Sequence, residues 1–214
     1  MLTLYSYWRS SASYRVRIAL NLKGLDYRTV PVHLVRDGGQ QFAEPYRSLN
    51  PQRRVPLLVD GEFRVAQSLA IIEYLDALQA SPRLLPLDAQ LRARVQAFSM
   101  AIAADVQPMQ NTGTLNYLRD VVGLDEAGRA QWLRHFLEQG LSALEAEAAT
   151  RPPTPFVFGD APTMADCVLV PQIFAARRFA CDMSKLPRLA AIAAHCDTLP
   201  AFQRAHPAQQ PDAE

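Results

Sequence analysis

The residues best suited to chemistry lie near the amino terminus, where hydroxyl side chains gather at the start of a predicted helix. Ser10, Ser11 and Ser13 follow an apolar strand pattern at 2–7 and precede a helical pattern at 14–20. A helix start exposes backbone N–H groups without intrahelical partners, together with the positive end of the helix dipole. Serine hydroxyls can donate to the same anion. The sequence therefore predicts an anion-binding junction, although serines before a helix also serve as plain N-caps.

The helix after this junction is expected to end at Gly24, because glycine suits the left-handed conformation of a helix end. Apolar side chains at helical spacing define its buried side, and we expect the other side chains to face solvent. The buried set comprises Val16, Ala19, Leu20 and Leu22, and the exposed set comprises Arg15, Arg17 and Asn21.

The next fifty or so residues continue with strand and helix signals in alternation. A second strand is predicted at 27–32, and a short helix at 40–47 is interrupted or ended by Pro45. Residues 55–59 and 62–65 form a predicted hairpin, because Asp-Gly at 60–61 is a strong turn signal. A further helix opens at Gln67-Ser68.

Beyond Pro86 the sequence predicts only helices. Long helical patterns occupy 90–104 and 124–149, and Thr163 with Asp166 has the spacing of a capping box. Pro171 lies inside the helix that follows and is expected to bend it. The tail after Pro207 is polar enough to fray.

Composition excludes several classes of protein. The 214 residues carry a net charge of +1, which gives no reason to expect a nucleic acid or an anionic membrane as partner. No apolar run reaches the roughly 20 residues that span a bilayer, and no signal peptide is apparent, so we expect a cytoplasmic protein. The 3 cysteines and 4 histidines have no spacing typical of a disulfide framework or a metal site, so the thiols are expected to be buried and structural.

The order of elements, with Val55-Pro56 just before the third strand, resembles the thioredoxin-like domain of glutathione transferases. The resemblance extends over essentially the whole chain, including Gln67-Ser68, a proline-bounded linker at 82–88 and the 163–166 box. Within that superfamily the chain is most similar to the zeta class, that of the maleylacetoacetate isomerases. The matching segments are YWRSS at 7–11, RVRIAL at 15–20, DGGQQ at 37–41, QPMQN at 107–111 and VPQ at 170–172.

This resemblance implies an α/β thioredoxin-like glutathione-binding domain at 1–81, a linker at 82–88 and an all-helical substrate-binding domain at 89–214. It also implies a homodimer. Glutathione is the expected cofactor: Ser68, with Gln67 beside it, suits the γ-glutamyl carboxylate at a helix start. The backbone of Val55, ahead of a cis bond to Pro56, suits the cysteinyl part. The other implied cofactor-binding residues are Gln41, Gln107 and Asn111 in the polar lining and Ser10, Ser11 and Ala12 at the thiol.

The implied reaction is a cis–trans isomerisation of a conjugated diketo acid that carries two carboxylates. A thiolate adds to the double bond, the bond rotates, and the thiolate leaves, so that glutathione acts as a coenzyme. A free thiol has a pKa of about 8.5, and a hydroxyl with a helix dipole could lower it by roughly one to two units. Ser10 is the first candidate for that hydroxyl and Ser11 the second. Arg9 and Arg178 are the candidates for binding the substrate carboxylates, and Arg9 for stabilising the charge of the reaction.

One residue departs from the zeta pattern, which usually reads Ser-Ser-Cys where this chain has Ala12. Turnover and inactivation can therefore differ from those of the family. The expected activity is conversion of maleylacetoacetate to fumarylacetoacetate in aromatic amino-acid catabolism. The nearest competing activity is that of the related maleylpyruvate isomerase. That enzyme has an arginine pair where this chain has Thr112-Gly113, which favours maleylacetoacetate. A conjugating transferase or α-haloacid dehalogenase would use the same thiolate to displace a leaving group, and a non-catalytic binding module would use the fold for protein contacts alone.

Overall fold

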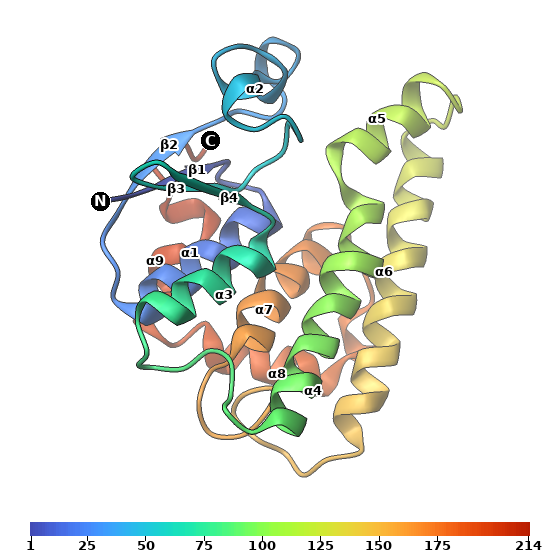
Figure 1. The fold of residues 1–214 in the computed structure, drawn as a ribbon. Coiled ribbons are helices and arrows are strands. Elements are labelled where there is room, and N and C mark those ends of the chain that lie inside the picture. Colours follow the sequence, from blue (N-terminus) through green and yellow to red (C-terminus); the bar gives the residue numbers. More distant parts are fainter. The chain divides into compact units, whose positions relative to one another are not determined.

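The computed structural model describes residues 1–214, which form two compact units. The first, which we call the sheet unit, comprises Met1–Leu85 together with Thr198–Glu214. The second, the helical unit, comprises Pro86–Asp197. Figure 1 shows the elements of both units, and each unit is described by itself below.

A mixed sheet of four strands forms the base of the sheet unit. Its strands are β1 (Leu2–Ser6), β2 (Tyr27–Pro31), β3 (Leu57–Asp60) and β4 (Phe63–Ala66), in the order β2-β1-β3-β4. The first strand pairs in parallel with β2 and antiparallel with β3. Asp60 pairs with Phe63 across the turn that holds Gly61, so the predicted hairpin is confirmed.

Helices lie on both faces of this sheet (Figure 1). One face is covered by α1 (Ser11–Lys23), α3 (Ser68–Leu78) and α9 (Pro200–Ala205), while α2 (Tyr46–Leu49) lies on the other. Gly24 ends α1 with a φ of 63°, as predicted. The single short helix expected at 40–47 is instead a 3-10 turn at Gln40–Phe42 followed by α2, because Pro45 separates the two.

The expectation that Arg15 and Arg17 face solvent is wrong. Their exposed fractions are 1% and 0%. Arg17 donates from Nε to the carbonyl oxygen of Ala205 at 3.0 Å and from a terminal nitrogen to that of Trp8 at 2.9 Å. Asn21 donates to the carbonyl oxygen of Ala201 at 2.9 Å and is half-buried. Helix α9, far away in the sequence, covers the side of α1 that its own pattern marks as exposed.

The tail after Pro207 does not fray as predicted. Residues Pro207–Gln209 form a 3-10 turn, and Asp212 accepts a hydrogen bond at 3.0 Å from the backbone N–H of Trp8, 204 residues earlier. The Glu214 carboxylate pairs with Arg36 and lies 3.3 Å from the His33 ring. Polar side chains keep this tail in place because they have specific partners on the sheet unit.

The helical unit contains every element from α4 to α8. Its α-helices are α4 (Ala89–Met100), α5 (Thr112–Asp120), α6 (Glu126–Ala149), α7 (Met164–Arg178) and α8 (Pro187–Cys196). The predicted helix at 90–104 continues beyond α4 as a π-helical turn, Ala101–Val106, and a 3-10 turn, Gln107–Gln110. Gly140 of α6 allows this turn to approach, because a Cβ there would lie 2.2 Å from a Val106 methyl.

Helix α7 is the core of the helical unit, and its start is the predicted capping box. The buried Asp166 carboxylate accepts from the backbone N–H of Val157 and from that of Thr163, each at 2.8 Å. Thr163 caps the helix in return through its hydroxyl. Burial raises the pKa of Asp166 to about 6. The helix continues across Pro171 to Arg178, and most of its residues are buried.

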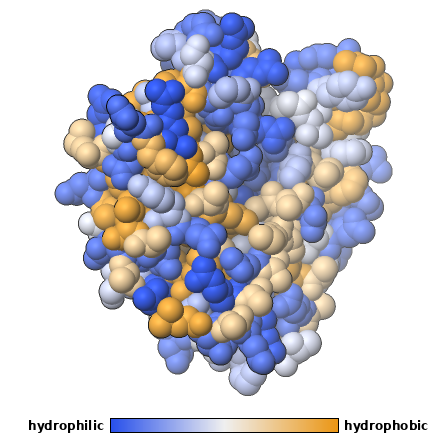
Figure 2. Space-filling view, viewed as in Figure 1, coloured by the Kyte–Doolittle hydropathy of each residue, from blue (hydrophilic) through white to orange (hydrophobic).

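The division into domains at 1–81 and 89–214 stays a prediction, because compact units need not coincide with domains. The compact units differ from these ranges in two segments. Residues 198–214 belong to the sheet unit, and the predicted linker 82–88 is divided between the units at Leu85 and Pro86. None of the helices combines the length and the apolar character needed to cross a membrane. On the face in Figure 2 hydrophilic and hydrophobic residues are interspersed. One of the hydrophobic groups lies over the end of α5, where Val121 and Val122 are exposed.

Candidate functional site

Ser10 is the N-cap of α1. Its backbone is extended, with φ −69° and ψ 119°, and its hydroxyl oxygen accepts the backbone N–H of Ser13 at 3.2 Å. The capping interpretation therefore holds for this serine. A hydroxyl has two lone pairs and one hydrogen, so an oxygen that accepts this bond still has its O–H to donate. The cap and an anion ligand are compatible roles.

The first two residues of α1 add backbone donors at the same place. The N–H groups of Ser11 and Ala12 take part in no hydrogen bond within the chain, and both residues are half-buried. The first turn holds no acidic side chain. Two free N–H groups, a hydroxyl and the positive end of a helix dipole are what a bound anion requires.

The loop before Ser10 is fixed by the peptide groups of Trp8. Its N–H donates to Asp212 at 3.0 Å, and its carbonyl oxygen accepts from Arg17 at 2.9 Å. The Arg9 guanidinium lies 5.3 Å from the centre of the Trp8 ring. The structure therefore places a positively charged side chain beside the junction, on a loop whose backbone is held on both sides.

Removing the carboxylate that holds this loop should loosen it. In Asp212→Ala the Trp8 N–H loses its acceptor, and we expect a loss of about 1–3 kcal/mol in the free energy of unfolding. Urea denaturation measures it. Asp212→Asn keeps an acceptor oxygen and should recover most of the loss. An alanine variant as stable as the parent would show that the tail does not hold the loop.

A second helix start lies in the same unit, at Ser68. This buried serine is the first residue of α3, and its hydroxyl oxygen accepts a terminal N–H of Arg15 at 3.2 Å. Gln67 precedes it with a φ of 71°, is exposed, and donates to the Gln52 side chain at 2.7 Å. No acidic residue occupies the first turn of α3.

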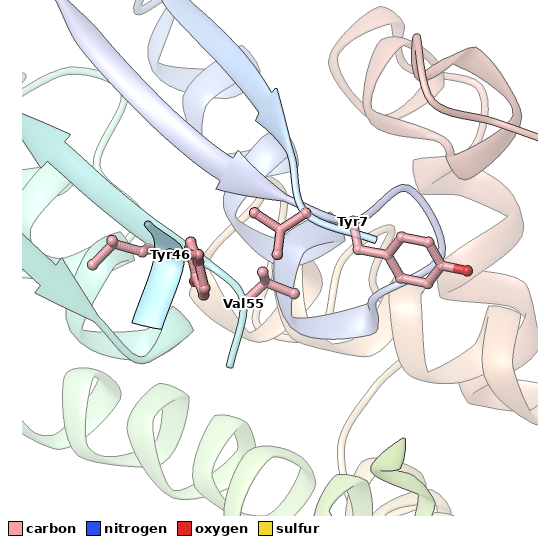
Figure 3. Close-up of a cluster of buried hydrophobic side chains, with 5 residues drawn as sticks. Tyr7, Tyr46 and Val55 are labelled. Atoms are coloured by element: carbon pink, nitrogen blue, oxygen red, sulfur yellow. The ribbon is translucent and has the colours of Figure 1, made fainter. Parts of the chain in front are cut away.

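Val55 offers backbone groups between these two helix starts. Its bond to Pro56 is cis, and its N–H and C=O take part in no backbone hydrogen bond. Its side chain packs in a buried cluster with Tyr7 and Tyr46 (Figure 3). Tyr46 also donates to the carbonyl oxygen of Arg54 at 2.5 Å, so the segment before Val55 is anchored.

Strand register explains why these three features converge. Tyr5 of β1 lies opposite Leu57 of β3, and Leu57 lies opposite Ala66 of β4. Residues that follow Tyr5, precede Leu57 or follow Ala66 therefore all leave the sheet at the same end. Ser10, Val55 and Ser68 are such residues, and the structure brings them to one end of the sheet.

Gln41 is a further buried residue of the sheet unit. Its amide nitrogen donates to the carbonyl oxygen of Leu34 at 3.3 Å, whereas its side-chain oxygen has no partner. Gly39 makes room for this side chain, because a Cβ there would lie 2.5 Å from the amide nitrogen. A buried oxygen without a donor is suited to accept from a ligand.

The other predicted residues belong to the helical unit. Gln107 donates to the Asn111 side chain at 2.7 Å, and both are half-buried in the turn after the π-helical segment. Such π-helical turns are frequent at functional sites. Arg178 ends α7, is exposed, and lies with its guanidinium 4.7 Å from the centre of the Phe179 ring.

No group of three or more His, Cys, Asp or Glu side chains is arranged to hold a metal ion. The three cysteines are free and buried, as predicted, and burial raises the pKa of Cys181 to about 11. Sequence reasoning missed one contact at this end of the sheet, the hydrogen bond from the buried Arg15 to Ser68. The only sequence signal of Arg15 is its place inside the matching segment 15–20.

Comparison with known proteins identifies the family to which the chain belongs. Residues 1–77 match the family described as "Glutathione S-transferase, N-terminal domain", and residues 126–197 match "Glutathione S-transferase, C-terminal domain". The chain belongs to the glutathione transferase family. Its thioredoxin-like and all-helical parts are those of this family, so the predicted fold class is confirmed.

Two relatives show where in the family the chain lies. A maleylacetoacetate isomerase of Pseudomonas aeruginosa is 46% identical over 98% of this chain and 97% of its own. A maleylpyruvate isomerase of a Ralstonia species is 44% identical over 98% of both chains. The predicted resemblance is confirmed. The sequence leaves open which of two substrates is isomerised, maleylacetoacetate or maleylpyruvate, and the two relatives are named for these two substrates.

Two solved structures match nearly the whole chain. The holo structure of a bacterial zeta-class maleylpyruvate isomerase has a TM-score of 0.96 and 44% identity, covering 99% of this chain and 100% of the other. A maleylacetoacetate isomerase of Methylobacterium extorquens, solved with bound malonate and glutathione, has a TM-score of 0.94 and 35% identity and covers 99% of both chains.

Proposed function

We propose that this protein is a glutathione-dependent cis–trans isomerase that converts maleylacetoacetate to fumarylacetoacetate. The observation that carries the proposal is the convergence of two helix starts and an unpaired backbone segment at one end of the sheet. The names of the relatives, and the glutathione in one related structure, support the same activity.

The residues at this end of the sheet fit glutathione group by group. A carboxylate suits the hydroxyl and the positive helix end at Ser68. A peptide suits the unpaired backbone of Val55, which can accept it as an added strand. A thiolate suits the hydroxyl of Ser10 and the N–H groups that follow it. Gln41 has a buried oxygen for one further donor.

Bound glutathione supplies a thiolate that adds reversibly to a double bond, so that the bond can rotate before the thiolate leaves. The chain itself stabilises negative charge. Ser10 is proposed to donate its O–H to the sulfur, with Ser11 as the second candidate donor. Because Ala12 stands in place of a cysteine, only hydroxyl and backbone N–H groups are available here to stabilise the negative charge on the sulfur.

Arg9 is proposed to bind a substrate carboxylate and to stabilise the charge that develops on the substrate. Its place beside Ser10, on a loop that Asp212 and Arg17 hold, supports this role. Gln107 and Asn111 as cofactor ligands, and Arg178 as a substrate ligand, rest on the resemblance alone. A homodimer is proposed on the same ground. A cytoplasmic location is proposed because no apolar run in the sequence reaches the roughly 20 residues that span a bilayer.

Maleylpyruvate is the second candidate substrate. The close match to a maleylpyruvate isomerase structure favours it, whereas Thr112-Gly113 in place of an arginine pair favours maleylacetoacetate. Both compounds are cis-dicarboxylates, so the site chemistry at Ser10 is the same for both.

Absorbance assays of the purified protein with each substrate test the proposal. We expect isomerisation of maleylacetoacetate that depends on added glutathione, with a lower kcat/KM for maleylpyruvate. Isomerisation that proceeds equally well without glutathione would refute the mechanism. Displacement of halide from an α-haloacid without isomerisation would indicate a dehalogenase, and glutathione binding without turnover would indicate a non-catalytic module.

A further inference from the structure

A buried guanidinium lies directly behind one of the two helix starts. Arg15 belongs to α1, has an exposed fraction of 1%, and reaches the hydroxyl oxygen of Ser68 at the start of α3 with one terminal nitrogen, at 3.2 Å. Its Nε and its other terminal nitrogen are also buried, and neither has a hydrogen-bond partner. Three donor groups of one side chain thus have a single protein acceptor.

This arginine also lacks a counter-charge. Lys23, buried on the same helix, pairs with the Asp76 carboxylate at 2.6 Å, whereas Arg15 forms no ion pair. Burial lowers the pKa of Arg15 to about 9, and no acidic group raises it again. The side chain is therefore still charged at neutral pH. An uncompensated buried charge costs stability, so its presence calls for a reason other than folding.

The hydrogen bond to Ser68 has a directional consequence. Because the guanidinium can only donate, it occupies a lone pair of the serine oxygen. The serine hydrogen is then directed away from Arg15 and can be donated to an acceptor at the start of α3. The positive charge also polarises this O–H group, which strengthens its bond to an anionic acceptor.

We propose that Arg15 is the positioning residue of the carboxylate end of the glutathione site: it fixes the Ser68 hydroxyl as a donor and supplies the positive charge behind it. The inference rests on the proposed function, because it takes the anion at α3 to be the γ-glutamyl carboxylate. Arg15 acts through Ser68 and has no part in the chemistry at Ser10. It determines affinity for glutathione, while turnover at saturation is set elsewhere.

The test uses Arg15→Met, which keeps the length of the side chain and removes its charge. By calorimetry we expect the Kd for glutathione to rise roughly 10- to 30-fold, with kcat at saturating glutathione within about twofold of the parent. The Kd for 4-aminobutyryl-cysteinylglycine, which lacks only the γ-glutamyl α-carboxylate, should change less than about twofold. Thermal unfolding should show an unchanged or higher Tm, because an unpaired buried charge is gone.

Lys23→Met is the matched control on the same helix. It leaves the buried Asp76 carboxylate with two backbone donors but without its charged partner, so Tm should fall by about 10 °C while the Kd for glutathione stays unchanged. Arg15→Lys keeps a charge and should bind glutathione closer to the parent than Arg15→Met does. If Arg15→Met does not fold, the Kd of Arg15→Lys for glutathione, compared with that of the parent, tests the role of Arg15 instead.

Three results would overturn the inference: an unchanged Kd for glutathione in Arg15→Met, an equal loss for glutathione and the analogue, or a lysine variant as weak as the methionine variant. Each requires a parent protein that binds glutathione. If the parent itself binds no glutathione, the proposed function fails first and the role of Arg15 fails with it.

Discussion

Replacing Ser10 with alanine is expected to lower kcat/KM for isomerisation by roughly 3- to 10-fold, because the helix start that remains keeps part of the pKa shift. Each unit by which the thiol pKa is lowered corresponds to about 1.4 kcal/mol in favour of the thiolate. The hydroxyl and the helix start together account for roughly one to two units. Steady-state kinetics at neutral pH, with saturating glutathione, measures the loss.

Ser10 is also an N-cap, so the alanine variant loses about 1 kcal/mol of stability in addition. Ser10→Asp separates the two effects, because aspartate caps a helix as well as serine but repels a thiolate. It should fold with parental stability and be at least as inactive as the alanine variant. Ser11→Ala identifies the donor: if it, and not Ser10→Ala, abolishes activity, the assignment passes to Ser11.

Replacing Asp166 with alanine is expected to cost about 3–5 kcal/mol in the free energy of unfolding. Its carboxylate accepts from the backbone N–H groups of Val157 and Thr163 and from the Thr163 hydroxyl at 3.0 Å. All three donors are buried and would lose their acceptor. Thr163→Ala removes the cap and the hydroxyl donor to Asp166 but leaves both backbone donors paired, so it should cost only about 1–2 kcal/mol. Equal losses in the two variants, measured by urea denaturation, would contradict this account.

The same carboxyl gives a pH dependence with a definite sign. Burial raises the pKa of Asp166 to about 6, above the roughly 3.9 of an unfolded chain. Between these values the folded state holds the proton and the unfolded state does not. The stability that this group contributes is therefore greatest below about pH 4 and falls as pH rises to about 6. Asp166→Asn should remove that part of the pH dependence.

The sequence predicted the elements that local signals encode. The Asp60-Gly61 turn, the stop at Gly24 and the box at Thr163–Asp166 lie where expected, because each depends on a few neighbouring residues. The helix starts at Ser10 and Ser68 also lie where the local pattern predicts them, and the resemblance added that they bind glutathione.

The burial of α1 was not predictable in this way. Arg15 and Arg17 look like the polar side of an amphipathic helix, and only contacts with α3 and α9 bury them. The order of the tail depends likewise on Asp212 reaching Trp8. A local pattern carries no information about partners about 50 or 200 residues away, so the residue behind Ser68 was missed.

The pKa of the bound glutathione thiol tests the central claim most directly. Titration of the complex, followed by thiolate absorbance near about 240 nm, should give a value one to two units below the roughly 8.5 of a free thiol. In Ser10→Ala the pKa should rise toward that of a free thiol, while the helix start keeps part of the shift. A bound thiol that titrates like free glutathione in the parent protein would contradict the claim that this helix start holds a thiolate.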